Sequence, residues 1–97
     1  MTREEALARL RRHEADLRKL GVNSLFLFGS TARGEARASS DVDLFNDDEK
    51  GTLGLLELIG IEEAASGSLG CKADAMPRRG INRFVRSRAE AEAVRVF

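Results

Sequence analysis

Hydrophobic residues along the chain alternate between helical spacing and short continuous runs. The first segment is typical of a helix, because Thr2 and Glu5 form a capping box and Gly21 can end the helix. Its apolar stripe is formed by Leu7, Leu10, Leu17 and Leu20. This spacing predicts one amphipathic helix over about residues 3–20, packed on whatever core follows.

Short apolar runs predict strands after this helix. The expected strands are about residues 24–28, 42–46, 72–76 and 93–97. Between them we expect a polar loop at 46–51, a helix from a Thr52 cap to about 65, a loop at 66–68 and a helix over 81–90. The last helix is expected to face inward with Ile81, Phe84, Val85 and Ala89. The order predicts an α/β (α+β) fold, a mixed sheet of about four strands covered by helices.

Two acidic side chains stand at the start of the second predicted strand. Asp41 and Asp43 are two residues apart, so on a strand they share one face. Carboxylates this close repel each other, and they are costly to desolvate beside an apolar core. A hard cation relieves both costs, and magnesium held by carboxylates and substrate phosphates is the common case.

A glycine and a serine precede this acidic pair. Gly29 ends the first strand where the backbone must turn, and it lets a phosphate come close. Ser30 offers a hydroxyl and a backbone N–H just before a short helix expected over 31–34. A phosphate cradle beside a metal platform indicates a site for a metal-bound nucleoside triphosphate.

The stretches 29–37, Gly-Ser-Thr-Ala-Arg-Gly-Glu-Ala-Arg, and 40–44, Ser-Asp-Val-Asp-Leu, carry a family resemblance. Together they resemble the signature of the minimal nucleotidyltransferases, in the DNA polymerase beta-like nucleotidyltransferase superfamily. The likeness runs over nearly the whole chain, to the closing residues 92–97. It implies a polymerase beta-like palm formed by one domain, residues 1–97.

The resemblance also implies a chemistry and a set of residues. A third acid of the family falls on Asp74, so Asp41, Asp43 and Asp74 are the expected catalytic and metal-binding residues, holding two Mg²⁺ ions. The expected reaction is in-line transfer of a nucleoside monophosphate, with pyrophosphate leaving. Gly29 and Ser30 are expected to bind the β and γ phosphate oxygens. Arg33 either adds charge there or forms an ion pair within the loop.

Family members of this size pair with small helical HEPN proteins. The resemblance implies an antitoxin that transfers AMP from ATP to a hydroxyl of a HEPN ribonuclease. Two alternatives stay open: a weak or inactive nucleotide-binding antitoxin that acts by contact alone, and transfer to a small molecule. A homodimer through the edge strand near 94–97 is also expected as an option.

The composition of the chain bears on which partners and which compartment are expected. The 97 residues hold 16 basic and 16 acidic side chains, so no direct nucleic-acid binding is predicted. No apolar run nears the roughly 18 residues of a membrane span. The single cysteine, Cys71, cannot form an internal disulfide, which fits a reducing cytoplasm.

Other motifs fail on inspection. Gly29 and Gly34 have Walker A spacing, but Glu35 and Ala36 stand where that loop needs lysine and serine or threonine. An EF-hand starting at Asp41 fails because it lacks the required glycine and the closing glutamate. His13 and Cys71 have no catalytic neighbours in sequence and are expected to be structural.

Overall fold

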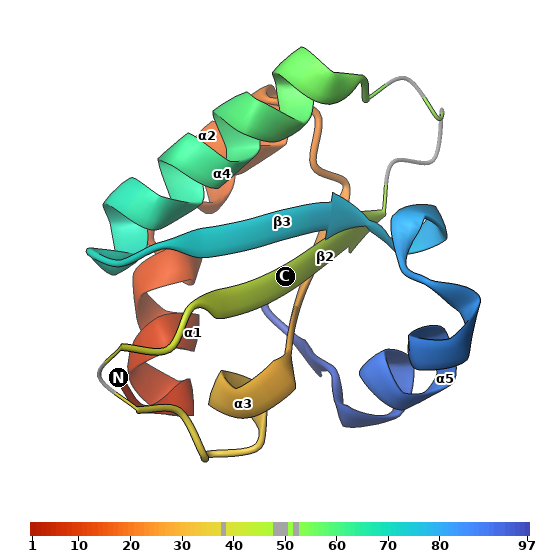
Figure 1. The fold of residues 1–97 in the computed structure, drawn as a ribbon. Coiled ribbons are helices and arrows are strands. Elements are labelled where there is room, and N and C mark those ends of the chain that lie inside the picture. Colours follow the sequence, from red (N-terminus) through yellow and green to blue (C-terminus); the bar gives the residue numbers. More distant parts are fainter. Residues whose placement is uncertain (38, 48–50, 52) are drawn as a thin grey trace.

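The computed structural model describes residues 1–37, 39–47, 51 and 53–97. It contains a four-stranded mixed sheet in the order β3-β2-β1-β4 (Figure 1). The strands are β1 (Ser24–Phe28), β2 (Val42–Asp47), β3 (Ala73–Pro77) and β4 (Val94–Arg95). β1 runs antiparallel to both β2 and β4, whereas β2 and β3 are parallel. The predicted mixed sheet covered by helices is confirmed.

The helices divide between the two faces of this sheet (Figure 1). The helices α1 (Arg3–Arg11), α2 (Glu14–Lys19) and α4 (Leu55–Leu69) lie on one face. The short α3 (Gly29–Ala32) follows β1 directly, and the 3₁₀ turn η1 (Arg78–Gly80) leads into α5 (Arg83–Glu92). α5 covers the other face, the one toward which Phe28 and Phe45 point. Among the described residues, no helix is long and apolar enough to cross a membrane.

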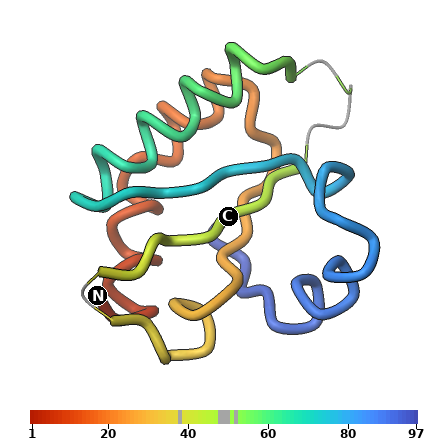
Figure 2. The backbone as a smooth tube through the Cα atoms, in the orientation of Figure 1, coloured from red at the N-terminus to blue at the C-terminus, as the bar shows by residue number. Residues whose placement is uncertain are grey.

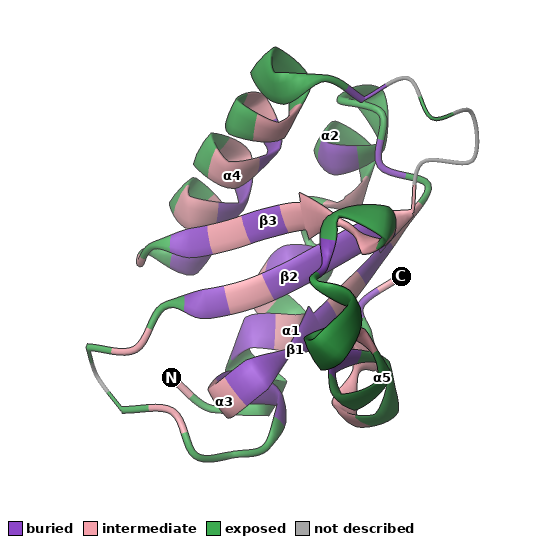
Figure 3. Cartoon of the chain, turned by 45° about the vertical axis from the view of Figure 1, so that its right-hand side comes forward, coloured by how far each residue is buried: buried purple, intermediate pink, exposed green. Residues whose placement is uncertain are grey.

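Each face of the sheet has its own apolar core. The larger core joins α1, α2 and α4 to the strands through buried residues such as Leu10, Leu27 and Ile61. The smaller core consists of Phe28, Phe45, Ile81 and Ala89 under α5. Buried and half-buried positions alternate over the first three residues of β2 and of β3, as the colours in Figure 3 show. This alternation follows from the two-residue period of a strand, and it leaves room for polar side chains on the α5 face.

The predicted first helix is wrong as a single element. The helix is interrupted at Arg12 and His13, where the His13 N–H donates to the carbonyl of Leu10 in a tight turn. At the end of α1, Arg11 donates to the carbonyls of Val96 and Arg95, so the first helix is tied to the end of the chain. His13 is exposed.

The predicted end of the second helix is also wrong. α4 continues through residues 66–68, where a loop was expected, and stops at Gly70 in the left-handed conformation. Burial of Leu69 stabilises this extra turn more than Gly67 and two serines destabilise it. The helix begins after Gly54, and Thr52, its predicted cap, lies outside the described residues.

Two further expectations fail in detail. Asn46 was expected where the second strand passes into the loop, but β2 continues to Asp47 and Asn46 is fully buried. Of the four residues expected to face inward from the last helix, Ile81 and Ala89 are buried as predicted, but Phe84 and Val85 are 80% and 48% exposed. At the chain end, β4 pairs with β1 and brings residues 94–97 alongside it (Figure 2). β4 lies at an edge of the sheet, so self-association through it stays a prediction.

Candidate active site

The turn between β1 and α3 is built around Gly29. Its φ of +75° lies in the left-handed region, which side chains other than hydrogen rarely allow. A Cβ at this position would overlap the Oδ2 atom of Asp43 on the neighbouring strand. Phe28 and Asp43 are register partners, so the turn begins beside this carboxylate. Glycine is therefore required both by the backbone and by the close approach of Asp43.

The structure brings the predicted acidic residues to one face of the sheet. Asp43 and Asp74 are register partners across the parallel strands β2 and β3, so their side chains point the same way. Asp41 comes just before β2 and reaches the same region, because Lys72 Nζ lies 3.8 Å from both Asp41 Oδ2 and Asp74 Oδ1. The parallel pairing of β2 and β3 is what carries Asp74 from a distant part of the chain to this site.

Electrostatics show how closely these carboxylates interact. Burial raises the pKa of Asp43 above its ordinary value, and the charges of Asp74 and Asp41 raise it further, while Arg33 partly opposes the shift. Lys72 is the ammonium group between the outer two carboxylates, and its side chain is 69% exposed. A single exposed ammonium group neutralises this cluster only in part, since water screens its charge.

The chemistry of these side chains fits a divalent cation. Carboxylate oxygens are the ligands that Mg²⁺ prefers. A bound cation would also relieve the repulsion from Asp74 and Asp41 that contributes to the raised pKa of Asp43. In the described part of the chain, however, no three histidine, cysteine or carboxylate side chains already form a group that could hold an ion. Mg²⁺ is commonly bound through one or two carboxylates together with substrate phosphates, and the aspartate cluster fits that mode of binding.

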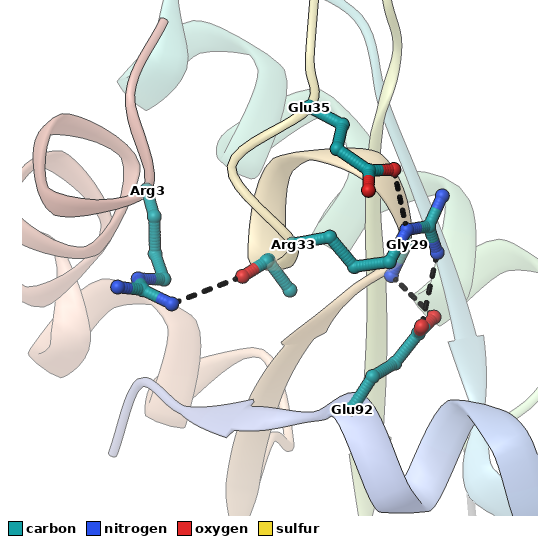
Figure 4. Close-up of polar contacts among 6 residues, drawn as sticks. Arg3, Gly29, Arg33, Glu35 and Glu92 are labelled. Atoms are coloured by element: carbon teal, nitrogen blue, oxygen red, sulfur yellow. Dashed lines mark hydrogen bonds and ion pairs between the residues drawn. The ribbon is translucent and has the colours of Figure 1, made fainter.

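Arg33 lies at the end of α3 and forms two ion pairs (Figure 4). Its Nε donates to Glu35 Oε2 and its Nη1 to Glu92 Oε2, each at 2.9 Å. The expected ion pair within the loop is therefore present, with a second partner from α5. Ser30 is half-buried next to Gly29, and its carbonyl accepts the N–H of Glu35, which closes the loop.

Glu92 is a residue of this site that sequence reasoning missed. Its Oε1 accepts the backbone N–H of Gly29 at 3.0 Å, and its side chain is only 17% exposed. Nothing in the local sequence around Glu92 distinguishes it from other acids of the last helix. The only available signal was its place directly before the apolar residues of the final strand, which pairs with β1.

A mixed sheet in which a Gly-Ser turn ends one strand beside paired aspartates of the next two defines a nucleotidyltransferase palm. The chain belongs to the nucleotidyltransferase domain family, whose description matches residues 10–96.

Within this family, the chain is similar to proteins named as protein adenylyltransferases. The protein adenylyltransferase MntA of Thermococcus cleftensis is 34% identical over 97 residues, which are 99% of this chain and 97% of the relative. The protein MJ1217 of Methanocaldococcus jannaschii, named as a candidate protein adenylyltransferase, is 36% identical over 87 residues, or 88% of each chain.

Solved structures agree with this placement. A candidate minimal nucleotidyltransferase superposes with a TM-score of 0.81 at 34% identity, over 97% of this chain and 95% of that one. The resemblance to minimal nucleotidyltransferases is thereby confirmed. A toxin–antitoxin crystal structure with AMP-PNP superposes with a TM-score of 0.74 over 90% of this chain and 72% of that one. Its identity of 17% shows a shared fold alone.

Proposed function

We propose that the chain is a magnesium-dependent protein adenylyltransferase. It transfers AMP from ATP to a hydroxyl of a helical HEPN-type toxin, and so acts as the antitoxin of a pair in the cytoplasm. The observation that carries this proposal is the gathering of Asp41, Asp43 and Asp74 beside the Gly29 turn. Relatives at 34% and 36% identity are named for protein adenylyltransfer, which supports the choice of a protein acceptor.

The three aspartates are the residues that would hold Mg²⁺, two ions in this proposal. Bound there, the ions supply charge neutralisation for the triphosphate and for the entering and leaving oxygens. Gly29 and Ser30 form the phosphate site at the start of α3: Gly29 shapes the turn, and Ser30 offers its hydroxyl and its backbone N–H to the phosphate tail. Asp74, on the outer strand, accepts the proton of the acceptor hydroxyl. The hydroxyl oxygen bonds to the α-phosphorus as the bond to pyrophosphate breaks.

The openness of the site explains the need for a partner. The side chains of Asp41 and Asp74 are 45% and 38% exposed, so water reaches the place where transfer would occur. Phosphoryl transfer depends on positioning and on the exclusion of competing water. In this proposal the toxin supplies both its hydroxyl and part of the enclosure.

The direct test uses the chain together with the product of the adjacent gene, which the proposal expects to be a helical HEPN-type toxin. With ATP and magnesium, mass spectrometry should show a gain of one or more AMP groups on the partner. Asp41→Asn and Asp43→Asn should abolish the gain, while Asp16→Asn, an exposed acid on α2, should leave it intact. A partner whose mass stays unchanged, although the chain binds ATP, would rule out the protein acceptor.

The alternative of neutralisation by contact is separated by a second measurement. The openness of the aspartate cluster is the feature that favours it, since binding alone needs no enclosure. A double variant with Asp41→Asn and Asp43→Asn should fail to neutralise the toxin if transfer is required. If the double variant protects cells as well as the natural chain, contact is sufficient. Transfer to a small molecule would instead appear as AMP on neither protein while pyrophosphate is released.

A further inference from the structure

A side chain at the end of α5 contacts the turn that the proposed function assigns to phosphate binding. Figure 4 shows Glu92 pointing from the end of α5 toward Gly29 and Arg33. One carboxylate oxygen accepts the Gly29 N–H at 3.0 Å, and the other accepts from Arg33 Nη1 at 2.9 Å. The side chain thus binds two groups of α3 and its C-cap with its two oxygens, and one of them, the Gly29 N–H, lies in the turn that the proposed function assigns to the nucleotide.

The backbone of Glu92 is fixed from two sides. It is the final residue of α5, whose Ala89 is buried in the smaller core. Val94, two residues later, pairs with Leu27 in the strand that leads into Gly29. A strand pairing and a buried helix turn together leave the carboxylate little freedom, so it is suited to hold another group in place.

The charge of Glu92 is maintained in this position. Burial alone would raise the pKa of its carboxyl, but the hydrogen bonds from Arg33 and from the Gly29 N–H lower it overall. Glu92 is therefore an anion at neutral pH, and its bond to the Gly29 N–H is charge-assisted. Such bonds are stronger than neutral ones and hold the donor more firmly.

The Gly29 position needs such a restraint. Its left-handed φ of +75° is one of several conformations that glycine adopts freely, so the residue itself does not select it. A small rotation would move the turn either into the Asp43 carboxylate or away from it. A fixed acceptor for the Gly29 N–H selects the conformation in which the turn lies against Asp43.

We propose that Glu92 is a positioning residue of the transfer reaction, because its Oε1 anchors the Gly29 N–H and so holds the turn beside Asp43. The inference rests on the proposed function, since it assigns a role within the same site. The opposing role is that of an internal competitor, an anion that the triphosphate must displace. The two roles predict opposite changes when the side chain is removed.

The experiment compares Glu92→Ala with Glu92→Gln. The glutamine keeps an oxygen acceptor for the Gly29 N–H but loses the ion pair with Arg33, whereas alanine loses both. We expect Glu92→Ala to lower kcat by about tenfold to a hundredfold, since small misplacements of a catalytic group cost that much. The Kd for an ATP analogue should change by less than about threefold, and Glu92→Gln should recover most of kcat.

A matched control comes from the same helix. Glu90 pairs with Arg78 at 3.6 Å and touches neither Gly29 nor Arg33, so Glu90→Gln should behave as the natural chain. Tighter nucleotide binding with unchanged or faster turnover in Glu92→Ala would overturn the proposal in favour of the competitor. Equal losses in the alanine and glutamine variants would overturn it too, because the acceptor oxygen would then not matter.

A readout without catalysis keeps this test independent of the proposed function. The Gly29 amide should exchange its proton slowly in the natural chain and in Glu92→Gln, and at least about tenfold faster in Glu92→Ala. The Gly34 amide, which donates to Thr31, serves as the internal reference. Unchanged exchange at Gly29 would overturn the anchor, whereas a natural chain that transfers no AMP would overturn only the function. If Glu92→Ala does not fold, Glu92→Asp replaces it, being one methylene too short to reach.

Discussion

At the scale of single residues, the close approach of Gly29 and Asp43 determines the geometry of the site. The structure offers a matched pair of glycines to measure it. Gly29 and Gly34 share a φ of +75°, but a Cβ at Gly34 would meet no atom within 4 Å, whereas one at Gly29 would overlap Asp43. The backbone penalty is thus common to both positions, and the contact with Asp43 belongs to one.

We expect Gly34→Ala to lower the free energy of unfolding by about 1–2 kcal/mol, the cost of the left-handed conformation. Gly29→Ala should cost about 1–3 kcal/mol more, because the added methyl group forces the Asp43 carboxylate aside. Urea denaturation of both variants measures the difference. Equal losses would mean that the turn does not lie against Asp43.

The Asp43 carboxylate destabilises the folded chain when it is charged. Its pKa is raised in the folded chain by burial and by two neighbouring carboxylates. The charged form is therefore less favourable in the folded than in the unfolded state, so stability falls as pH rises through the folded pKa. Below the unfolded value of about 3.9 both states are protonated and the cost is absent.

Asp43→Asn should consequently raise the melting temperature of the metal-free protein at pH 7, by more than it does near pH 4. The amide keeps the shape of the side chain and removes the charge. Addition of Mg²⁺ with nucleotide should then stabilise the natural chain but not the variant. A variant less stable than the natural chain at pH 7 would show that Asp43 is not under this electrostatic strain.

At the scale of elements, β2 combines the acidic site at one end with a buried amide at the other. Asn46 is fully buried in the sheet, and among the described residues neither its Oδ1 nor its Nδ2 has a hydrogen-bond partner. An unpaired amide in a dry environment costs free energy that a leucine of similar shape does not. The unpaired amide of Asn46 therefore lowers the free energy of unfolding below the value that an apolar side chain at this position would give.

Asn46→Leu should increase the free energy of unfolding by about 1–3 kcal/mol. The measurement is chemical denaturation, with the circular dichroism spectrum as the check that the fold is kept. Because Asn46 lies three residues from Asp43, nucleotide binding should be unchanged. A loss of stability would indicate that the amide has polar partners in solution.

The secondary-structure elements that could be predicted are those in which the spacing of apolar residues along the sequence matches the positions that are buried in the fold. β1 and β2 are short apolar runs with polar residues at their ends, so both strands and the shared face of Asp41 and Asp43 follow from sequence. The burial of Asn46 could not be predicted, because a polar side chain where a strand passes into a polar loop gives no sign of burial. The exposure of Phe84 could not be predicted either, since helix α5 is oriented by Ala89 and Glu92 rather than by its largest apolar residue.

Contacts between residues far apart in the sequence could not be predicted either. Glu92 and Gly29 are 63 residues apart, and the pairing of β4 with β1 and the packing of α5 on the sheet bring them together. The extension of α4 to Leu69 is likewise a tertiary effect, because burial of that leucine outweighs a serine- and glycine-rich local sequence. A single sequence carries no direct record of either contact.

At the scale of the whole molecule, the charge is balanced but unevenly placed. The chain has 16 basic and 16 acidic side chains, yet the proposed site brings Asp41, Asp43 and Asp74 together with Lys72 as the only base in an ion pair with them, among the described residues. Such a site favours a cation and disfavours a free polyphosphate. The two ligands should therefore bind together, each making the other more favourable.

Isothermal titration calorimetry of a magnesium-loaded, non-hydrolysable ATP analogue tests the central claim most directly. The chain should take up the analogue with magnesium, alone or with its partner protein present, and far more weakly when magnesium is removed. Asp43→Asn should abolish the magnesium-dependent part, while Asp16→Asn should not. Binding that is absent under all these conditions, or unchanged in Asp43→Asn, would contradict the account.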